Sequence, residues 1–343
     1  MNSFTLNVVQ LAIGFFLIFF AYFSQSFIEE SVIDSYAHKG VVDKHDGYTS
    51  LAIIFASLTV STFLAAPIVG VLNPKWAMVF GASTYVIFQL GFLFLNKAFL
   101  FGSSAFVGLG AAVIWTAQGS YIALNSTEET ANKHVSLFWS VSQSCFAFGG
   151  VFLYFVFRHT DSFGEHTVHT IYSVFTAVTI LGAVVLALLR MPVYPPGMQL
   201  TDGKIIPKEV PLTHMQMFAS TIKLARKQRM LVLSVGLLYT GLQLSFWSGI
   251  YPTCISFTQK LGTNTKTLLA MSTIMQGFGE ATSGIVFGLL GTSNAYRPSR
   301  IQIVCFGTFA HLVAYIAVFV NFPTFAPLTS TNENALIEPR YIQ

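Results

Sequence analysis

Residues 268–290 read LLAMSTIMQGFGEATSGIVFGLL and carry a single charged side chain, Glu280, close to their centre. About 20 apolar residues in a helix are enough to cross the hydrocarbon core of a bilayer, so this stretch predicts a membrane-spanning helix. Every other acidic residue lies near a gap between apolar runs. The stretch therefore indicates the fold class and sets Glu280 apart from the remaining carboxylates.

The composition of the whole chain points to the same class. Of 343 residues, 53% are hydrophobic and only 9% are charged, whereas about 25% of the residues are charged in soluble domains. Three cysteines without a C-x-x-C spacing argue against a disulfide framework and against a zinc site. No cleavable signal peptide is expected, because the first apolar run is long and has no basic flank before it.

Charged residues are so rare that they mark the ends of the apolar runs. Nine runs are long enough to span a bilayer, six before a long polar stretch and three after it. We therefore predict an all-α multi-pass membrane protein with nine transmembrane helices. They are expected at about 6–28, 49–71, 76–95, 99–123, 135–157, 168–189, 231–254, 267–290 and 301–321.

The orientation follows from the basic residues. A cytoplasmic N-terminus places eleven Lys and Arg residues inside and seven outside, so this orientation is predicted. It also places the N-x-S/T sequon at Asn125 on the cytoplasmic side, where we expect no glycan. Both the plasma membrane and an endolysosomal membrane are compatible with this topology.

The polar stretch predicts a cytoplasmic loop that contains a basic amphipathic helix, because apolar residues recur there at helical spacing. This apolar set is Met215, Phe218, Ile222 and Ala225. Such a helix is either a site for a partner or anionic lipids, or a positive-inside anchor. The predicted organisation is a six-helix bundle at 1–190, the loop at 191–230, a partial three-helix bundle at 231–321 and a non-cytoplasmic tail at 322–343.

Three segments carry a family resemblance. GLGAAVIWTAQGSYIALNST at 108–127, NSTEETANKHVSLFWSVSQS at 125–144 and SQSFIEESV at 24–32 resemble the uncoordinated-93-like branch of the major facilitator superfamily. The subgroup that they resemble most comprises the major-facilitator domain-containing, uncoordinated-93-like proteins. The resemblance implies a bundle of two six-helix halves. Nine helices then correspond to a complete first half and three helices of the second, as in a short isoform or an incomplete gene product.

The resemblance implies two candidate functions. One is secondary transport, and the other follows relatives that act as regulatory subunits of potassium channels or as trafficking partners of receptors. The loop at 70–76 holds only Lys75, where major facilitators normally carry an acidic residue and several basic ones. This departure favours the regulatory role for this chain, and we expect no transport by nine helices alone. The polar helix faces favour transport by longer relatives.

Five predicted helices each present a glutamine on one side. Amides buried in hydrocarbon need hydrogen-bond partners, so these faces are expected to turn toward a shared central cavity. The alternative is that Gln, Ser and Gly only mediate helix packing. The candidate cavity and coupling residues are Gln25, Trp115, Gln118, Trp139, Gln143, Gln243, Trp247, Gln276 and Glu280.

Glu280 is the strongest candidate of this set. An ionisable group at mid-bilayer costs roughly 2.5–3.5 kcal/mol on insertion scales, and no Lys or Arg lies inside a predicted span to neutralise it. It is therefore expected to be protonated at neutral pH or to face water. Two interpretations stay open, a proton-coupling or cation site and a structural acid hydrogen-bonded to its neighbours.

The other ionisable groups are weaker candidates. His311 lies inside a predicted span that is peripheral in a major facilitator bundle, and residues 158–169 gather three histidines in an outside loop. A metal or pH-sensing site there is the alternative to a solvated loop. No catalytic triad, phosphate loop, dinucleotide fingerprint or zinc motif is present, so we predict no enzyme, cofactor, metal or nucleic-acid site. The expected partners are the lipid bilayer, a small solute, and a channel or receptor.

Overall fold

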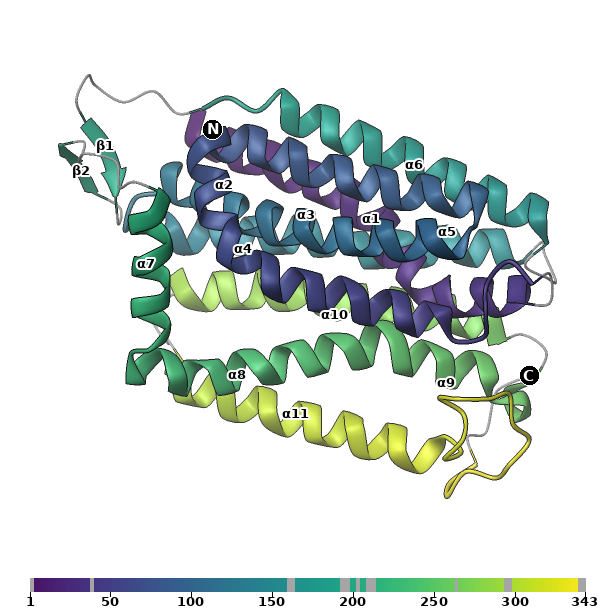
Figure 1. Ribbon diagram of the computed structural model, residues 1–343. Helices are drawn as coiled ribbons and strands as arrows, with labels where there is room; N and C mark the ends of the chain where they lie inside the picture. The colour runs from purple at the N-terminus through teal and green to yellow at the C-terminus, as the bar shows by residue number, and fades with distance from the viewer. Residues whose placement is uncertain are drawn as a thin grey trace.

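The computed structural model describes residues 3–37, 40–158, 164–191, 198–201, 204–207, 214–262, 265–292 and 298–338. Most of these residues form helices that run along one common direction (Figure 1). The longer helices are α1 (Ser3–Ala37), α2 (Asp46–Gly91), α3 (Lys97–Leu124), α4 (Ala131–Gln143), α5 (Cys145–Arg158), α6 (Glu165–Ala187), α7 (His214–Ala225), α8 (Gln228–Ser245), α10 (Thr265–Thr292) and α11 (Arg300–Asn321). The shorter elements are η1 (Phe92–Phe94), η2 (Phe246–Ile250), α9 (Tyr251–Phe257), η3 (Gln259–Leu261) and the hairpin of β1 (Met198–Thr201) with β2 (Lys204–Pro207).

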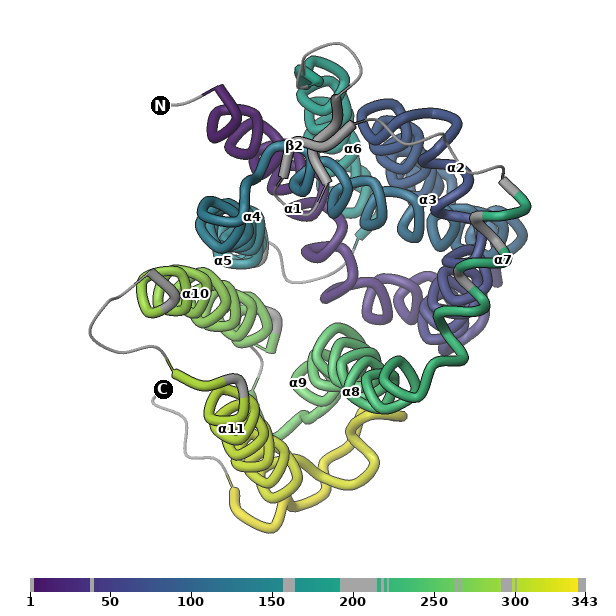
Figure 2. Tube along the Cα trace, turned by 90° about the vertical axis from the view of Figure 1, so that its left-hand side faces the viewer, coloured from purple at the N-terminus to yellow at the C-terminus, as the bar shows by residue number. Residues whose placement is uncertain are grey.

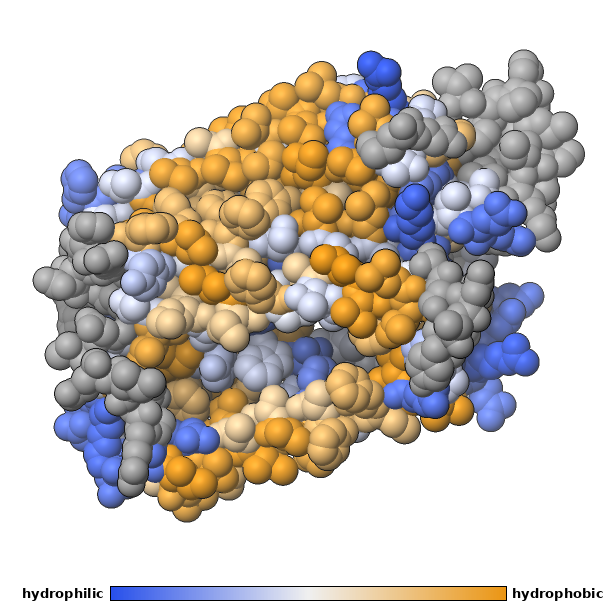
Figure 3. Space-filling model, turned by 180° about the vertical axis from the view of Figure 1, so that it is seen from behind, coloured by the Kyte–Doolittle hydropathy of each residue, from blue (hydrophilic) through white to orange (hydrophobic). Residues whose placement is uncertain are grey.

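Seven helical segments of the described chain are long and apolar enough to cross a membrane. They are Ser3–Ala37, Asp46–Phe94, Lys97–Leu124, Ala131–Val156, Glu165–Ala187, Gln228–Phe257 and Ile301–Asn321. Figure 3 shows a broad hydrophobic band across the molecule, with hydrophilic residues gathered at the two ends of the helices. The prediction of an all-α multi-pass membrane protein is confirmed at this level.

Helix α2 contains both of the spans that the sequence predicts at 49–71 and 76–95. The helix is broken at Asn73, whose backbone is non-helical, with φ 58° and ψ 162°. Pro74 causes this break, because its ring disfavours helical geometry in the residue before it. Asn is among the residues that tolerate a positive φ. Figure 1 shows α2 as two helical halves that meet at one end of the bundle.

The first six long helices share an aromatic core. Trp115 of α3 stacks on Trp139 of α4, with ring centroids 5.7 Å apart and planes at 14°. Phe15 of α1 contacts Trp115 edge-on at 5.3 Å and Phe138 of α4 at 5.1 Å. Such edge-to-face and offset contacts are the favoured geometries of aromatic pairs. They fix α1, α3 and α4 against one another.

Small residues bring α10 close to α4 and α5. A Cβ on Gly277 would lie 2.7 Å from the Cα of Ala147, and a Cβ on Gly150 would lie 2.8 Å from the carbonyl oxygen of Ala270. In lipid, helix association depends on such close packing, because burial in hydrocarbon offers no hydrophobic gain between helices. The helices form two groups, the first made of α1 to α6 and the second of α8 to α11. Figure 2 looks along the helices and shows α10, of the second group, beside α4 and α5, of the first.

The segment between the two groups of helices contains α7, which begins at His214 and ends at Ala225. Figure 1 shows α7 lying across one end of the bundle, roughly perpendicular to the other helices. Met215 is exposed and Ile222 is half-buried, while the side chain of Phe218 lies outside the described residues. A surface helix is therefore present at the predicted place, and its role as a lipid or partner site stays a prediction.

Candidate functional site

Glu280 of α10 is held by two glutamines. Gln143, the last residue of α4, donates a hydrogen bond from Nε2 to Oε2 of Glu280 at 2.6 Å. Gln276, one turn earlier in α10, donates from Nε2 to Oε1 at 3.0 Å. Each carboxylate oxygen thus accepts one hydrogen bond from an amide group, and no cation is needed to satisfy it. Hydrogen bonds to ionised groups are the stronger ones, so this arrangement stabilises the charged carboxylate.

A cavity of about 380 Å³ opens beside this carboxylate, between α4 and α10. Trp139, Gln143, Glu280, Ser283 and Gly284 contribute to its walls. Pockets for small molecules start at roughly 300 Å³, so the cavity is large enough to hold a small solute or several waters. A carboxylate that faces such a space can exchange a proton with water.

The position of the site follows from the row of small residues on α10. A Cβ on Gly284 would lie 3.2 Å from the backbone nitrogen of Ser140, and one on Gly288 would lie 2.9 Å from the Cβ of Ser136. Gly277, Gly284 and Gly288 are spaced by seven and four residues, and they share one face of the helix. Glu280 lies between them in sequence, so the packing that joins the helices also places its side chain against α4.

A second cavity of about 260 Å³ lies at the centre of the bundle. Its walls are mostly aromatic and aliphatic, with Phe19, Tyr85, Trp115 and Leu244 among them. Trp139 lines this cavity as well as the one beside Glu280. Trp139 therefore borders both the apolar cavity and the polar one.

The structure brings some of the predicted cavity residues together and leaves others apart. Hydrogen bonds join Glu280 to Gln276 and Gln143, and Trp115 stacks on Trp139, which lines the same cavity as Gln143 and Glu280. Besides Gln276, four predicted members line neither of the two cavities, and these are Gln25, Gln118, Gln243 and Trp247.

Those four residues have different surroundings. Gln25 is fully buried in α1 and Gln118 is buried in α3, whereas Gln243 is half-buried in α8. Trp247 stacks on Tyr315 of α11, with ring centroids 6.1 Å apart. Their assignment to a shared cavity stays a prediction.

The weaker candidates have ordinary surroundings. His311 Nδ1 forms a hydrogen bond with the hydroxyl group of Tyr239 at 2.6 Å, which joins α11 to α8. His166 and His169 are exposed, while His159 and Asp161 lie outside the described residues. Within the part of the chain that the structure describes, no group of three or more His, Cys, Asp or Glu side chains is placed to hold a metal ion.

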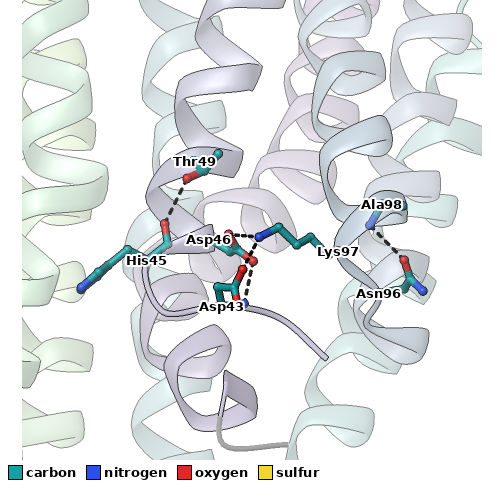
Figure 4. A network of polar contacts seen from close by, with 7 residues as sticks. All are labelled: Asp43, His45, Asp46, Thr49, Asn96, Lys97 and Ala98. Carbon is teal, nitrogen blue, oxygen red and sulfur yellow. Dashed lines mark hydrogen bonds and ion pairs between the residues drawn. The ribbon is translucent and has the colours of Figure 1, made fainter. Parts of the chain in front are cut away.

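A charged network lies at the end of the first group of helices where α3 begins (Figure 4). Lys97, at the start of α3, forms ion pairs with Asp43 and with Asp46, the latter at 3.3 Å. Asn96 caps α3 by accepting a hydrogen bond from the backbone amide of Ala98 at 2.9 Å. The network ties the connection between α1 and α2 to the beginning of α3. The ion pair with the exposed Asp43 contributes little to stability, whereas Asp46 is buried beside Lys97.

Sequence reasoning missed two buried carboxylates, Glu29 and Glu30 in α1. Both were expected in a gap after the first span, but α1 continues to Ala37 and buries both. The signal that could have found them is the absence of Gly or Pro between Phe15 and Gly40, which leaves nothing to end the helix at Glu29.

The chain matches known proteins along most of its length. Residues 38–342 match the family model described as "Ion channel regulatory protein UNC-93". The chain is 30% identical over 345 residues to UNC93-like protein MFSD11 of Xenopus laevis, which covers 97% of this chain and 77% of that protein. It is 23% identical over 358 residues to protein unc-93 homolog A of Bos taurus, with 92% of this chain and 73% of that protein covered. The resemblance is thereby confirmed, and the chain belongs to the UNC-93 family, the uncoordinated-93-like branch of the major facilitator superfamily.

Proposed function

We propose that this chain is a major facilitator bundle of nine spans in which Glu280 and Gln143 form a proton-coupling site, which its longer relatives use in secondary transport. The seven apolar segments become nine if α2 crosses twice, turning at Asn73, and if α10 crosses as well. Helix α10 has 28 residues, and about 20 suffice to span a bilayer. The spans then fall into six before α7 and three after it.

One observation carries the coupling proposal. The hydrogen bond of 2.6 Å between Gln143 and Glu280 joins α4, in the first group of helices, to α10, in the second. In major facilitators the two halves move against each other around a site near the bilayer midplane. A titratable group that bonds across this boundary can make the relative position of the halves depend on its protonation.

The chemistry of the site suits this role. The ionised carboxylate accepts one hydrogen bond from each of two amide groups, those of Gln143 and Gln276. Protonation replaces an anionic acceptor by a neutral one and weakens both bonds, because charge-assisted hydrogen bonds are about twice as strong as neutral ones. The neighbouring cavity of about 380 Å³ gives water, and a small solute, access to the carboxylate.

The test is infrared difference spectroscopy of the full chain in lipid nanodiscs, recorded between two pH values. We expect a band of a protonated carboxyl group that is lost in Glu280→Gln and kept in Glu333→Gln, a matched change at an exposed tail position. In proteoliposomes, any uptake from a panel of small solutes by a longer relative should lose its dependence on pH after the equivalent change. An identical spectrum for Glu280→Gln and the unmodified chain would remove the coupling role.

Regulation of an ion channel is a second candidate function, which the description of the family as ion channel regulatory proteins favours. A local observation agrees with it. The single basic residue of the loop between the halves of α2, Lys75, lies over the ring of Trp76, with Nζ 5.2 Å from the centroid. A cation engaged with an aromatic ring is a weak basis for a gating charge network. Co-purification of a channel subunit from native membranes with the tagged chain, in the absence of any measurable flux, would favour this second function.

A further inference from the structure

The second half of α1 buries two adjacent carboxylates that the coupling proposal does not use. Glu29 is 6% exposed and Glu30 is 8% exposed. Carboxylates are almost never this buried unless they are paired or bound to a cation. Glu30 has a partner, because its Oε1 lies 2.9 Å from Nδ1 of His45.

The second oxygen of Glu30 lies beside the first turn of α2. It is so close to Gly47 that a Cβ there would overlap it, and the backbone amide of Tyr48 is also near. The start of a helix favours negative charge, so α2 accounts for the position of Glu30. Glu30 Oε2 nevertheless has no hydrogen-bond partner among the described residues, and Glu29 does not lie at the start of a helix. Its Oε1 is fully buried and has no hydrogen-bond partner among the described residues.

Both carboxylates line a small cavity between the two groups of helices. Its walls come from α1, the first turns of α2, η2 and α9, and its volume is about 20 Å³. A cavity needs roughly 10–15 Å³ to hold one water. The space therefore fits one particle of that size and excludes an organic solute.

The hydroxyl groups of this cavity offer lone pairs, because their protons are already donated elsewhere. Ser26, Ser248 and Thr253 each donate to the carbonyl oxygen of the residue four positions earlier, at 3.0, 2.7 and 2.9 Å. Tyr48 donates to the carbonyl oxygen of Pro327 at 2.9 Å. The cavity thus combines neutral oxygen acceptors with the carboxylate group of Glu29.

The groups around the carboxylates add little positive charge. On α1, Asp34 lies near Glu30, and the phenol of Tyr22 lies near Glu29. Ser50 of α2, Gln25 of α1 and Tyr172 of α6 also lie near Glu29, and the side-chain amide of Gln25 has no hydrogen-bond partner among the described residues. His45 is engaged by Glu30, Lys97 is engaged by Asp43 and Asp46, and Cys254 of α9 follows Thr253 at the wall.

We propose that this cavity binds a monovalent metal cation, Na⁺ or K⁺, with Glu29 as the anionic ligand and the surrounding hydroxyl groups as neutral ligands. Oxygen ligands suit hard cations. The volume admits an ion only without its water shell, and a divalent ion such as Mg²⁺ gives up its waters reluctantly. The ligands come from both groups of helices, so the cation links α1 and α2 to η2 and α9.

The test uses the purified full chain in phosphatidylcholine nanodiscs at fixed pH and ionic strength. Thermal unfolding is followed in NaCl, in KCl and in N-methyl-D-glucamine chloride. We expect Na⁺ or K⁺ to raise Tm saturably by roughly 2–4 °C, because a ligand that binds only the folded state stabilises it. N-methyl-D-glucamine, which is too large for the cavity, should give no rise.

Variants decide whether the effect comes from this cavity. Glu29→Gln should abolish the cation-dependent rise and melt no lower than the unmodified chain in N-methyl-D-glucamine, because it removes an uncompensated buried charge. Thr253→Val, which removes one neutral ligand at similar volume, should raise the half-saturating concentration several-fold. Glu280→Gln and Glu333→Gln should keep the response, which separates this site from the coupling site.

Three results would overturn the proposal. The first is an equal rise in all three salts, and the second is an unchanged response in Glu29→Gln. The third is a stabilisation that follows pH but not Na⁺ or K⁺, which would assign the cavity to a proton. If Glu29→Gln does not fold, an unchanged half-saturating concentration in Thr253→Val overturns it.

Discussion

Gly277 of α10 lies directly against the backbone of Ala147 in α5, so that a Cβ on Gly277 would stand 2.7 Å from the Cα of Ala147. Real Cβ atoms do not approach a backbone atom this closely, and helix backbones cannot yield as a flexible side chain can. The contact therefore requires glycine at position 277. It also holds Glu280, one turn further along α10, in reach of Gln143.

Gly277→Ala is expected to destabilise the protein by about 1–3 kcal/mol, the usual range for overpacking a close contact. Gly279→Ala is the matched control, because nothing lies within 4 Å of its Cβ position. That control should be neutral or stabilising by up to about 1 kcal/mol, as Ala is the better helix former. Thermal unfolding in nanodiscs measures both, and equal effects of the two changes would contradict the close crossing.

The hydrogen bond between Gln143 and Glu280 should appear as a coupling energy. Gln143→Leu and Glu280→Gln, alone and combined, form a double-mutant cycle. We expect a coupling of about 1–2 kcal/mol at neutral pH, since one partner is ionised, and a smaller coupling in acid, where the carboxyl group is protonated. The same cycle with Trp76→Leu in place of Gln143→Leu should give none. A coupling that does not change with pH would show that Glu280 does not titrate.

Asn125 should carry no glycan, and its substitution should destabilise the protein. Its side chain is 2% exposed, donates to the carbonyl oxygen of Tyr121 at 2.9 Å and accepts from Asn7 at 2.9 Å. Asn125→Ala leaves the Asn7 amide without this partner, which costs about 1–3 kcal/mol in a buried site. Thermal unfolding checks the stability. A shift in gel mobility after endoglycosidase treatment of the unmodified chain would contradict the first expectation.

The proposed orientation of the C-terminal tail can be tested with one new sequon. Leu336→Thr creates Asn334-Ala335-Thr at an exposed position. If the tail is non-cytoplasmic, this variant should gain an endoglycosidase-sensitive mass when it is expressed in a glycosylating cell, and Asn334→Gln in the same background should remove it. Persistent absence of the glycan would contradict the prediction that the tail is non-cytoplasmic.

The general architecture was predictable because few charges interrupt long apolar runs. Charged residues were expected to mark the ends of the helices, and α3 does begin at Lys97 while α5 ends at Arg158. The pairing of Glu280 with Gln143 was only partly predictable. Helical spacing places each residue on a polar face of its own helix, but the distance between them depends on Gly277 and Ala147, which look unremarkable in sequence.

Two features could not be predicted by counting charges. Glu29 was treated as the end of a span, but its burial comes from tertiary contacts with α2, η2 and α9 that no local pattern encodes. The predicted helix at 231–254 contains the π-helical turn η2 before Pro252. Proline lacks the amide that would bond to the residue four positions earlier, so the ladder shifts there. Pro252 could be read from the sequence, but the π-helical turn that it produces at Ser248 and Gly249 could not.

The close crossing of α5 and α10 restricts how the two groups of helices can move. Gly277 lies against Ala147, and Gly150, about one helical turn further along α5, lies against the carbonyl oxygen of Ala270. Contacts of this kind leave no clearance for one helix to slide along the other or to separate from it. A rearrangement that keeps this contact would have to rock about the point where α5 and α10 touch, and it would widen one mouth of the protein while it narrows the opposite one.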